Sequence, residues 1–157
     1  PCGSDVESMS CPFCTLPDIQ ERVIARNDLA FAFLTNIPIV EGHTLIVPVR
    51  CVGAFDELTP QEVQAIFDLR VVVRNALVKT FDAQGFHYLW NEGEVAGQHV
   101  AHVHMQVVPR KQGDAGIYTY EPKQYLYLPG RERPISAPEE LHTTASLIQK
   151  NILWPTK

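Results

Sequence analysis

The sequence has few cysteines, little excess charge of one sign and no long apolar run. Four cysteines in 157 residues are too few for a disulfide scaffold. The formal net charge of -5 disfavours broad electrostatic binding of nucleic acid, although a small local anion pocket is compatible with it. No run approaches the roughly 20 apolar residues that span a bilayer, and no secretory signal pattern opens the chain. We therefore expect a cytoplasmic protein that binds neither nucleic acid nor membrane.

The overall composition of the chain is that of an ordinary globular domain. The chain is 45% hydrophobic and 20% charged, and its length suits one substantial core. Residues 1–8 are small, polar and patternless, so we expect a leader or a vector remnant there. We expect one domain over residues 9–115 and a C-terminal extension over 116–157 that contains a short helix at 139–150.

The hydrophobic pattern predicts a sheet with one long helix. Strands are expected over 21–25, 29–34, 44–48, 86–90 and 98–110, and a three-residue turn joins the first two. The segment Thr59-Pro-Gln-Glu62 has capping-box spacing with proline at the first helical position. Apolar residues then follow at helical spacing and stop before Gly85. One long helix among about five strands predicts an α+β fold.

The most informative segment is 98–110, in which histidines alternate with apolar residues. On a strand, every second side chain shares one face, so His102, His104 and Gln106 would form a row. One interpretation is a half-exposed strand with satisfied polar residues. The other is a histidine nucleophile, because a neutral imidazole can attack phosphorus and split one displacement into two steps. Backbone N–H groups of the preceding glycine-rich loop would then hold phosphate oxygens.

The pair Cys11-Pro-Phe-Cys14 has the spacing of half a metal site or of a redox pair. It is also compatible with two half-buried structural cysteines. No βαβ unit follows, which disfavours a thioredoxin-type role. A tetrahedral zinc site needs two further ligands, for which Cys51 and His102 are the candidates. The sequence pattern by itself leaves this ligand set open.

Together these segments resemble the histidine triad superfamily, whose mark is His-x-His-x-His followed by two apolar residues. Here His102-Val-His104-Met-Gln106-Val-Val108 occupies that motif, and Gly42-His-Thr-Leu-Ile-Val-Pro48 is a further match. The resemblance covers most of residues 11–114, and its flanks look closest to the fragile-histidine-triad type of dinucleoside-polyphosphate hydrolase. It implies a five-stranded antiparallel sheet with one long helix packed on it. It also implies a homodimer with a continuous ten-stranded sheet.

The resemblance also implies roles for individual residues. His104 would be the nucleophile that takes the nucleoside monophosphoryl group, His43 would support the catalytic imidazole, and His102 and Gln106 would complete the catalytic set. Substrate contacts to ribose or phosphate are implied at Thr35, Asn36, Asn91, Gly97, Gln98 and His99. In several relatives a Cys-x-x-Cys pair joins two further ligands in a structural zinc site. The corresponding residues here are Cys11, Cys14, Cys51 and His102, and no organic cofactor is implied.

The chain departs from the family pattern at two positions. The third triad position is Gln106, and His-x-His-x-Gln is the pattern of the transferase branch. An amide can hold a phosphoryl oxygen, but it cannot carry a proton as imidazole does. His99 stands where many relatives carry serine or threonine. The sequence thus predicts a nucleotide phosphoanhydride hydrolase acting through a nucleotidyl-His104 intermediate. The alternatives are a nucleotidyltransferase or phosphorylase, and a nucleotide-binding sensor with little turnover.

Overall fold

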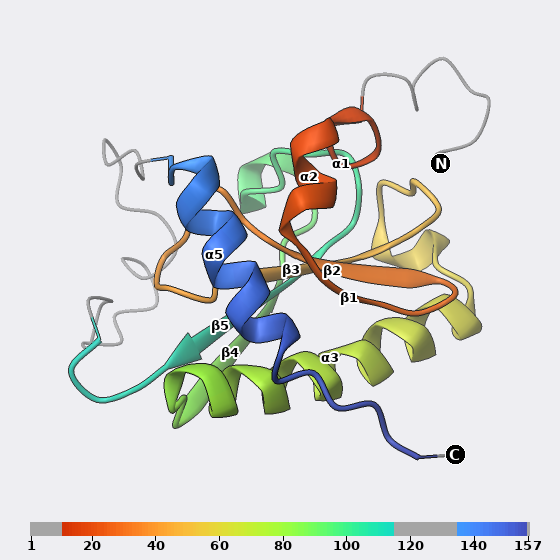
Figure 1. The fold of residues 1–157 in the computed structure, drawn as a ribbon. Helices are drawn as coiled ribbons and strands as arrows, with labels where there is room; N and C mark the ends of the chain where they lie inside the picture. Colours follow the sequence, from red (N-terminus) through yellow and green to blue (C-terminus); the bar gives the residue numbers. More distant parts are fainter. Residues whose placement is uncertain (1–10, 115–134, 157) are drawn as a thin grey trace.

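The sheet has five antiparallel strands, in a computed structural model that describes residues 11–114 and 135–156 (Figure 1). The strand order is β1-β2-β3-β5-β4. The strands are β1 (Val23–Arg26), β2 (Ala30–Leu34), β3 (Thr44–Pro48), β4 (Gly85–Trp90) and β5 (Met105–Arg110). This arrangement confirms the predicted α+β class and the five-stranded sheet. The leader expected at residues 1–8 lies outside the described residues.

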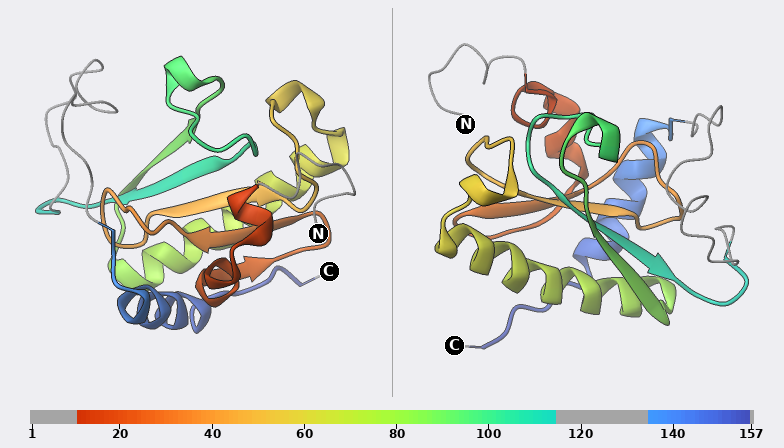
Figure 2. Two further views of the ribbon diagram at one scale, coloured as in Figure 1. Left: turned by 90° about the horizontal axis from the view of Figure 1, so that it is seen from above. Right: turned by 180° about the vertical axis from the view of Figure 1, so that it is seen from behind.

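Four helices accompany the sheet within the described ranges. The long helix α3 (Pro60–Phe81) packs on β2, β3 and β5, and α5 (Pro138–Gln149) packs on β1, α2 and α3 (Figures 1 and 2). The short helices α1 (Pro12–Thr15) and α2 (Pro17–Arg22) precede β1. None of the helices in the described ranges is long and apolar enough to cross a membrane. The predicted long helix and the predicted helix near the C-terminus are both present.

Both faces of the sheet are covered, which the burial of β2 shows directly. All five β2 residues are buried, although alternate residues point to opposite faces. Ala32 and Leu34 belong to the core formed with α3 and α5. Phe31 and Phe33 belong to a second cluster on the other face, together with Ile19 of α2. Strands between two apolar layers are expected to read as continuous apolar runs, as β2 does.

The same alternation in β5 decides which face carries the predicted site. Met105 and Val107 are buried in the core beneath α3. Gln106 lies between them and therefore points to the opposite face. It pairs across the sheet with Leu45, a member of the second cluster. The third triad position is thus on the face that carries α1 and α2.

Two predicted strands begin two or more residues later than the sequence pattern indicated. Residues 21 and 22 end helix α2, and β1 starts at Val23. Arg22 explains this, because its guanidinium donates to Asp18 at 3.0 Å and to the carbonyl oxygen of Leu34. The histidine strand was predicted from residue 98, but β5 starts at Met105. Val103 donates its N–H to the carbonyl oxygen of Val52 at 2.7 Å, outside the sheet ladder.

Helix α3 begins at the predicted capping box. The Thr59 hydroxyl accepts from the Glu62 N–H at 3.1 Å, and the Glu62 carboxylate accepts from the Thr59 N–H at 2.9 Å. The same carboxylate accepts two hydrogen bonds from the Arg50 guanidinium at 2.8 and 2.9 Å. Arg50 follows β3, so this pair ties the end of β3 to the start of α3.

The Arg50 contact should make part of the stability dependent on pH. Hydrogen bonding to Arg50 lowers the pKa of Glu62 from its ordinary value of 4.5. Stability from the charged carboxylate is therefore complete above that value and is lost as the pH falls through the folded pKa. Glu62→Gln should lower the free energy of unfolding by about 1 kcal/mol at pH 7, since Arg50 is half exposed. Urea titrations at several pH values measure this, and the difference should shrink below pH 4.5.

The control is Glu41→Gln, which removes an exposed carboxylate away from this contact. An equal loss of stability in both variants, or a Glu62→Gln effect that persists at low pH, would contradict the assignment to the Arg50 pair.

Candidate functional site

His104 is a buried imidazole immediately before β5, and its hydrogen bonding defines which ring nitrogen carries the proton. Its Nδ1 lies 2.9 Å from the carbonyl oxygen of His102. A carbonyl oxygen only accepts, so Nδ1 carries a hydrogen and donates it. In a neutral ring the other nitrogen, Nε2, then has a free lone pair.

Burial keeps this ring neutral. Loss of solvent lowers the pKa of His104 below its ordinary value of 6.5, and the charge of His99 lowers it further against the opposing hydrogen bond to His102. His99 is exposed, so it lies at the solvent side of the site. A neutral imidazole with an unprotonated Nε2 is the form that can act as a nucleophile.

Three polar side chains beside His104 are joined by hydrogen bonds into a chain, the relay, which consists of His43, Gln106 and Asn91. His43 accepts the Ile39 backbone N–H at its Nδ1, at 3.1 Å, so its neutral ring carries the hydrogen on Nε2. That Nε2 donates to Oε1 of Gln106 at 3.0 Å. Gln106 Nε2 then donates to Oδ1 of Asn91 at 2.7 Å, and Asn91 donates to the Ala96 carbonyl oxygen at 2.8 Å. The relay determines the orientation of the Gln106 amide, and His43 contacts this amide.

The position of His43 depends on the glycine before it. Gly42 has a φ of 86°, and a Cβ there would lie 2.9 Å from Cε2 of Phe81. Only glycine suits both the positive φ and the lack of space for a Cβ at this position. His43 also receives the N–H of Thr35 on its carbonyl oxygen at 3.1 Å. Thr35 is buried and Asn36 beside it is half-buried, so both predicted substrate contacts lie next to His43.

Two other predicted substrate residues organise the loop before His104. The Gly97 N–H donates to the Glu94 carbonyl oxygen at 2.9 Å, with Gly97 at a φ of 93°. The Gln98 side chain accepts from the Gly93 N–H and donates to the Gly53 carbonyl oxygen, both at 2.8 Å. These groups join the loop at 91–98 to the loop at 51–58. Their predicted contact with substrate remains a prediction.

The cluster predicted as a metal site comes together from three separate segments. The sulfur atoms of Cys11, Cys14 and Cys51 and a ring nitrogen of His102 all lie within 4.8 Å of one another. His102 Nδ1 is 3.3 Å from Cys11 Sγ and 3.5 Å from Cys14 Sγ. Its Nε2 lies 2.9 Å from the carbonyl oxygen of Pro48, to which it donates a hydrogen. Nδ1 therefore presents its lone pair to the cysteines.

The donor set fits a tetrahedral zinc ion once Cys14, whose sulfur is disulfide-bonded in this structure, is reduced to a thiolate. Bond lengths of about 2.0–2.3 Å at tetrahedral angles separate ligand atoms by roughly 3.5–3.8 Å, close to the 3.3 and 3.5 Å between His102 Nδ1 and the Cys11 and Cys14 sulfurs. Burial lowers the pKa of His102 to about 4, which keeps the ring neutral as a ligand requires. Burial and the neighbouring Cys11 raise the pKa of the Cys51 thiol to about 12. A bound cation would lower the pKa of this thiol again, because it stabilises the thiolate.

The sequence pattern did not identify Phe13 as part of the site. Its ring lies 5.4 Å from the ring of His104 and 5.7 Å from that of His102, measured between centroids. The sequence did contain one signal for Phe13, which is its position between two candidate metal ligands. A short turn that binds a metal brings its middle residues close to the other ligands.

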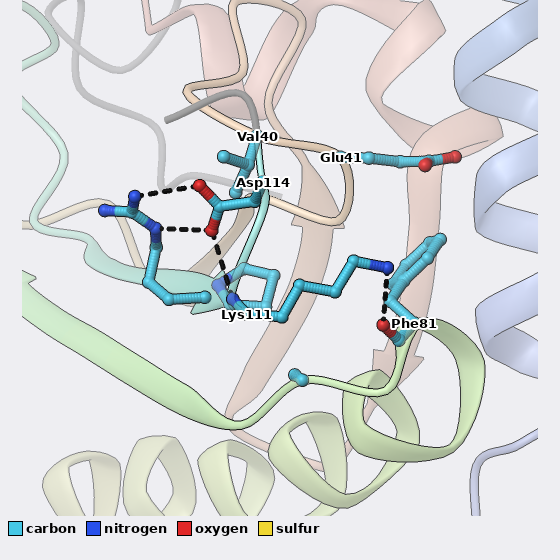
Figure 3. Close-up of a pocket in the computed structure, with 8 residues that line it drawn as sticks. Val40, Glu41, Phe81, Lys111 and Asp114 are labelled. Atoms are coloured by element: carbon cyan, nitrogen blue, oxygen red, sulfur yellow. Dashed lines mark hydrogen bonds and ion pairs between the residues drawn. The ribbon is translucent and has the colours of Figure 1, made fainter. Parts of the chain in front are cut away.

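A cavity of about 210 Å³ lies at the far end of β5 from His104 (Figure 3). Arg110, the last residue of β5, pairs with Asp114 at 2.8 and 2.9 Å there. Lys111 donates to the Phe81 carbonyl oxygen at 3.0 Å. Residues 105–108 lie between His104 and Pro109, the first residue of β5 that lines this cavity, which is about 17 Å along the strand. It is therefore distinct from the cluster of predicted site residues.

Comparison with known proteins gives one consistent family. A family model described as HIT domain matches residues 17–113. An uncharacterized HIT-like protein of Mycoplasma genitalium is 35% identical over 69% of this chain and 78% of its own length. The asymmetrical bis(5'-nucleosyl)-tetraphosphatase of Schizosaccharomyces pombe is 34% identical over 73% of this chain and 68% of its own. A solved Zn-bound histidine triad family protein from Mycobacterium smegmatis has a TM-score of 0.65 at 26% identity, covering 91% of this chain and 96% of that chain.

The burial of His104 gives a prediction about its titration. Because desolvation lowers its pKa, the ring should titrate below 6.5 in the folded protein and should gain its proton only at lower pH. NMR of the assigned ring protons between pH 4 and pH 8 measures the midpoint. The same resonance in urea-denatured protein is the reference. A folded midpoint at or above the denatured one would refute the neutral nucleophile.

Proposed function

The chain belongs to the HIT domain family, and from this premise we propose that it hydrolyses nucleotide phosphoanhydrides through a covalent nucleotidyl intermediate on His104. The observation that carries the proposal is the bond from His104 Nδ1 to the His102 carbonyl oxygen. It leaves the lone pair of Nε2 available for attack. The family includes named nucleotide hydrolases, such as the fission yeast tetraphosphatase, which supports a nucleotide phosphohydrolase.

The proposed reaction has two displacements at one phosphorus atom. Nε2 of His104 bonds to the phosphorus of the nucleoside monophosphoryl group, and the bond from that phosphorus to the bridging oxygen breaks. The rest of the polyphosphate leaves with the electron pair. The ring then carries a positive charge, which the carbonyl oxygen of His102 stabilises through Nδ1–H. Water attacks the phosphorus in the second step, the phosphorus–nitrogen bond breaks, and the nucleoside monophosphate departs as the water proton passes to solvent.

Gln106 supports a substrate with a good leaving group. One N–H of its amide donates to Asn91, and the second would donate to a phosphoryl oxygen of the substrate. The amide cannot protonate the leaving oxygen. A missing general acid costs about 10²–10⁴-fold when the leaving group needs a proton. Polyphosphates leave without one, so Gln106 fits a phosphoanhydride substrate, and the motifs that flank it favour a dinucleoside polyphosphate.

Gln106 also supports the second candidate, a nucleotidyltransferase or phosphorylase. The first displacement is the same, but phosphate or another acceptor would replace water in the second. A nucleotide-binding sensor with little turnover is the third candidate. The retained nucleophile and its hydrogen bond argue against the sensor, because binding alone requires neither.

Product analysis separates these candidates. Diadenosine tetraphosphate incubated without orthophosphate should yield AMP and ATP, measured by anion-exchange chromatography. ADP formed only when orthophosphate is added would identify a phosphorylase and would replace the hydrolase proposal. His104→Asn should lower turnover by roughly 10⁴-fold while nucleotide affinity is retained. The control is His142→Asn, an exposed histidine of α5 that should leave both quantities unchanged.

We further propose that Cys11, Cys14, Cys51 and His102 hold a structural zinc ion. When bound, the ion supplies fixed geometry and no open coordination position. The four ligands would then tie the N-terminal turn and the loop after β3 to the segment that carries His104. A Zn-bound structure in the same family supports the choice of metal.

Reduced protein should therefore contain one zinc ion per chain by atomic emission, because zinc needs each cysteine as a thiolate. Cys51→Ser should lower zinc affinity at least roughly tenfold and should lower the unfolding midpoint, since metal binding contributes folding energy. His142→Asn, the exposed histidine of α5, is the control and should retain full zinc. Full zinc content in Cys51→Ser would remove Cys51 from the site.

We also infer that two copies pair through the edge of β4 that no other described strand covers. Within the described residues β4 pairs only with β5, and all six of its residues are half-buried rather than buried. An edge strand presents backbone N–H and C=O groups that can pair with a strand of another chain. A monomeric sedimentation coefficient would contradict the ten-stranded dimer.

A further inference from the structure

Phe13 lies at the centre of a group of three rings on the face of the sheet that carries the site. Its ring meets that of His104 at an interplanar angle of 87° and that of Phe33 at 67°, with centroids 5.4 and 5.3 Å apart. The ring of His102 lies 5.7 Å away at 53°. Edge-on contacts of this geometry are favourable aromatic pairs. One aromatic side chain therefore touches the nucleophile candidate, a metal-ligand candidate and the core.

The turn that holds Phe13 is the turn that holds two of the candidate metal ligands. The carbonyl oxygen of Cys11 accepts the N–H groups of Cys14 and Thr15, both at 3.1 Å. The Thr15 hydroxyl adds a third bond to the same oxygen at 2.8 Å. Helix α1 has only four residues, so tertiary contacts must hold it in place. Those contacts include the rings around Phe13 and the cluster of Cys11, Cys14, Cys51 and His102.

The ring of His104 needs a second restraint besides its hydrogen bond. Rotation of an imidazole about χ2 has broad and shallow preferences. A ring flip would break the Nδ1 bond to His102 and would turn Nε2 away from its present direction. The ring of Phe13 packs against the His104 ring, with centroids 5.4 Å apart at an interplanar angle of 87°, and this contact opposes that rotation. Close packing of this kind restricts a side chain without forming any bond to it.

We propose that Phe13 is a positioning residue that holds His104 in its Nδ1–H tautomer and orientation, so that the metal-binding turn sets the direction of the nucleophile. The proposal rests on the proposed function only in calling His104 the nucleophile. The geometric claim concerns the ring itself. Phe13 acts through His104, and it has no chemical part in the reaction.

The first test needs no substrate and measures which ring nitrogen of His104 carries the hydrogen. Long-range proton–nitrogen NMR distinguishes the two neutral tautomers, and His104→Asn assigns the signals. The wild type should show the Nδ1–H form alone. Phe13→Ala should show a mixture of tautomers, and removing the metal with a chelator should give the same mixture. A pure Nδ1–H form in Phe13→Ala would overturn the proposal, whatever the enzyme does with nucleotides.

The kinetic test separates positioning from contact with the nucleotide. Phe13→Ala should lower kcat by roughly three- to tenfold, which corresponds to the worth of one aromatic pair, with little change in KM. Phe13→Leu keeps part of the packing without an aromatic ring and should fall between the wild type and Phe13→Ala, whereas Phe13→Tyr keeps the ring and should restore kcat. Phe67→Ala removes an exposed ring of α3 and should change neither quantity.

Two further outcomes would overturn the proposal. A rise in KM with kcat unchanged would make Phe13 a wall of the nucleotide pocket. Loss of zinc binding in both Phe13→Ala and Phe13→Leu would make it a residue that folds the metal turn. If no nucleotide is turned over by the wild type, the proposed function fails, and the tautomer measurement still decides whether Phe13 positions His104.

Discussion

The hydrogen bond between His104 Nδ1 and the carbonyl oxygen of His102 is the interaction on which the site depends. It links two residues only two positions apart, and each has a different task. The ring of His102 turns toward three cysteine sulfurs, while its carbonyl oxygen determines the tautomer of His104. A metal bound to the first ring would therefore restrain the backbone that orients the second. Burial of both rings keeps them neutral, as a ligand and a nucleophile require.

The two-sided core gives this short segment its rigidity. Met105 and Val107 are anchored beneath α3, so Gln106 faces the opposite side, where the relay from His43 holds its amide. The direction of every hydrogen bond in that relay follows from one backbone N–H, that of Ile39. An amide held in this way presents a donor of known direction. It has no proton to give, which matches a substrate whose leaving group needs none.

Local patterns predicted some elements well and others poorly, for identifiable reasons. The capping box at Thr59 and the helix that follows were correct, because both depend on residues close in sequence. The start of β1 was wrong, because Arg22 extends α2 through a contact with Leu34, twelve residues away. The start of β5 was also wrong. Segment 98–104 lies outside the sheet ladder, where His102 reaches the cysteine cluster and Val103 reaches the Val52 carbonyl oxygen, and no alternation of residue types indicates this path.

The amino-acid sequence by itself determined the family, the strand and helix content, and the residue types available for nucleophilic and metal chemistry. Cys11, Cys14, Cys51 and His102 could be named from their motif positions, because family motifs preserve spacing. Only the tertiary structure decided which nitrogen of each ring carries its hydrogen, and that Phe13 contacts His104. Those properties depend on carbonyl oxygens and rings brought together from distant segments. Their distances follow from how the whole chain packs, and short-range patterns of residue type do not contain that information.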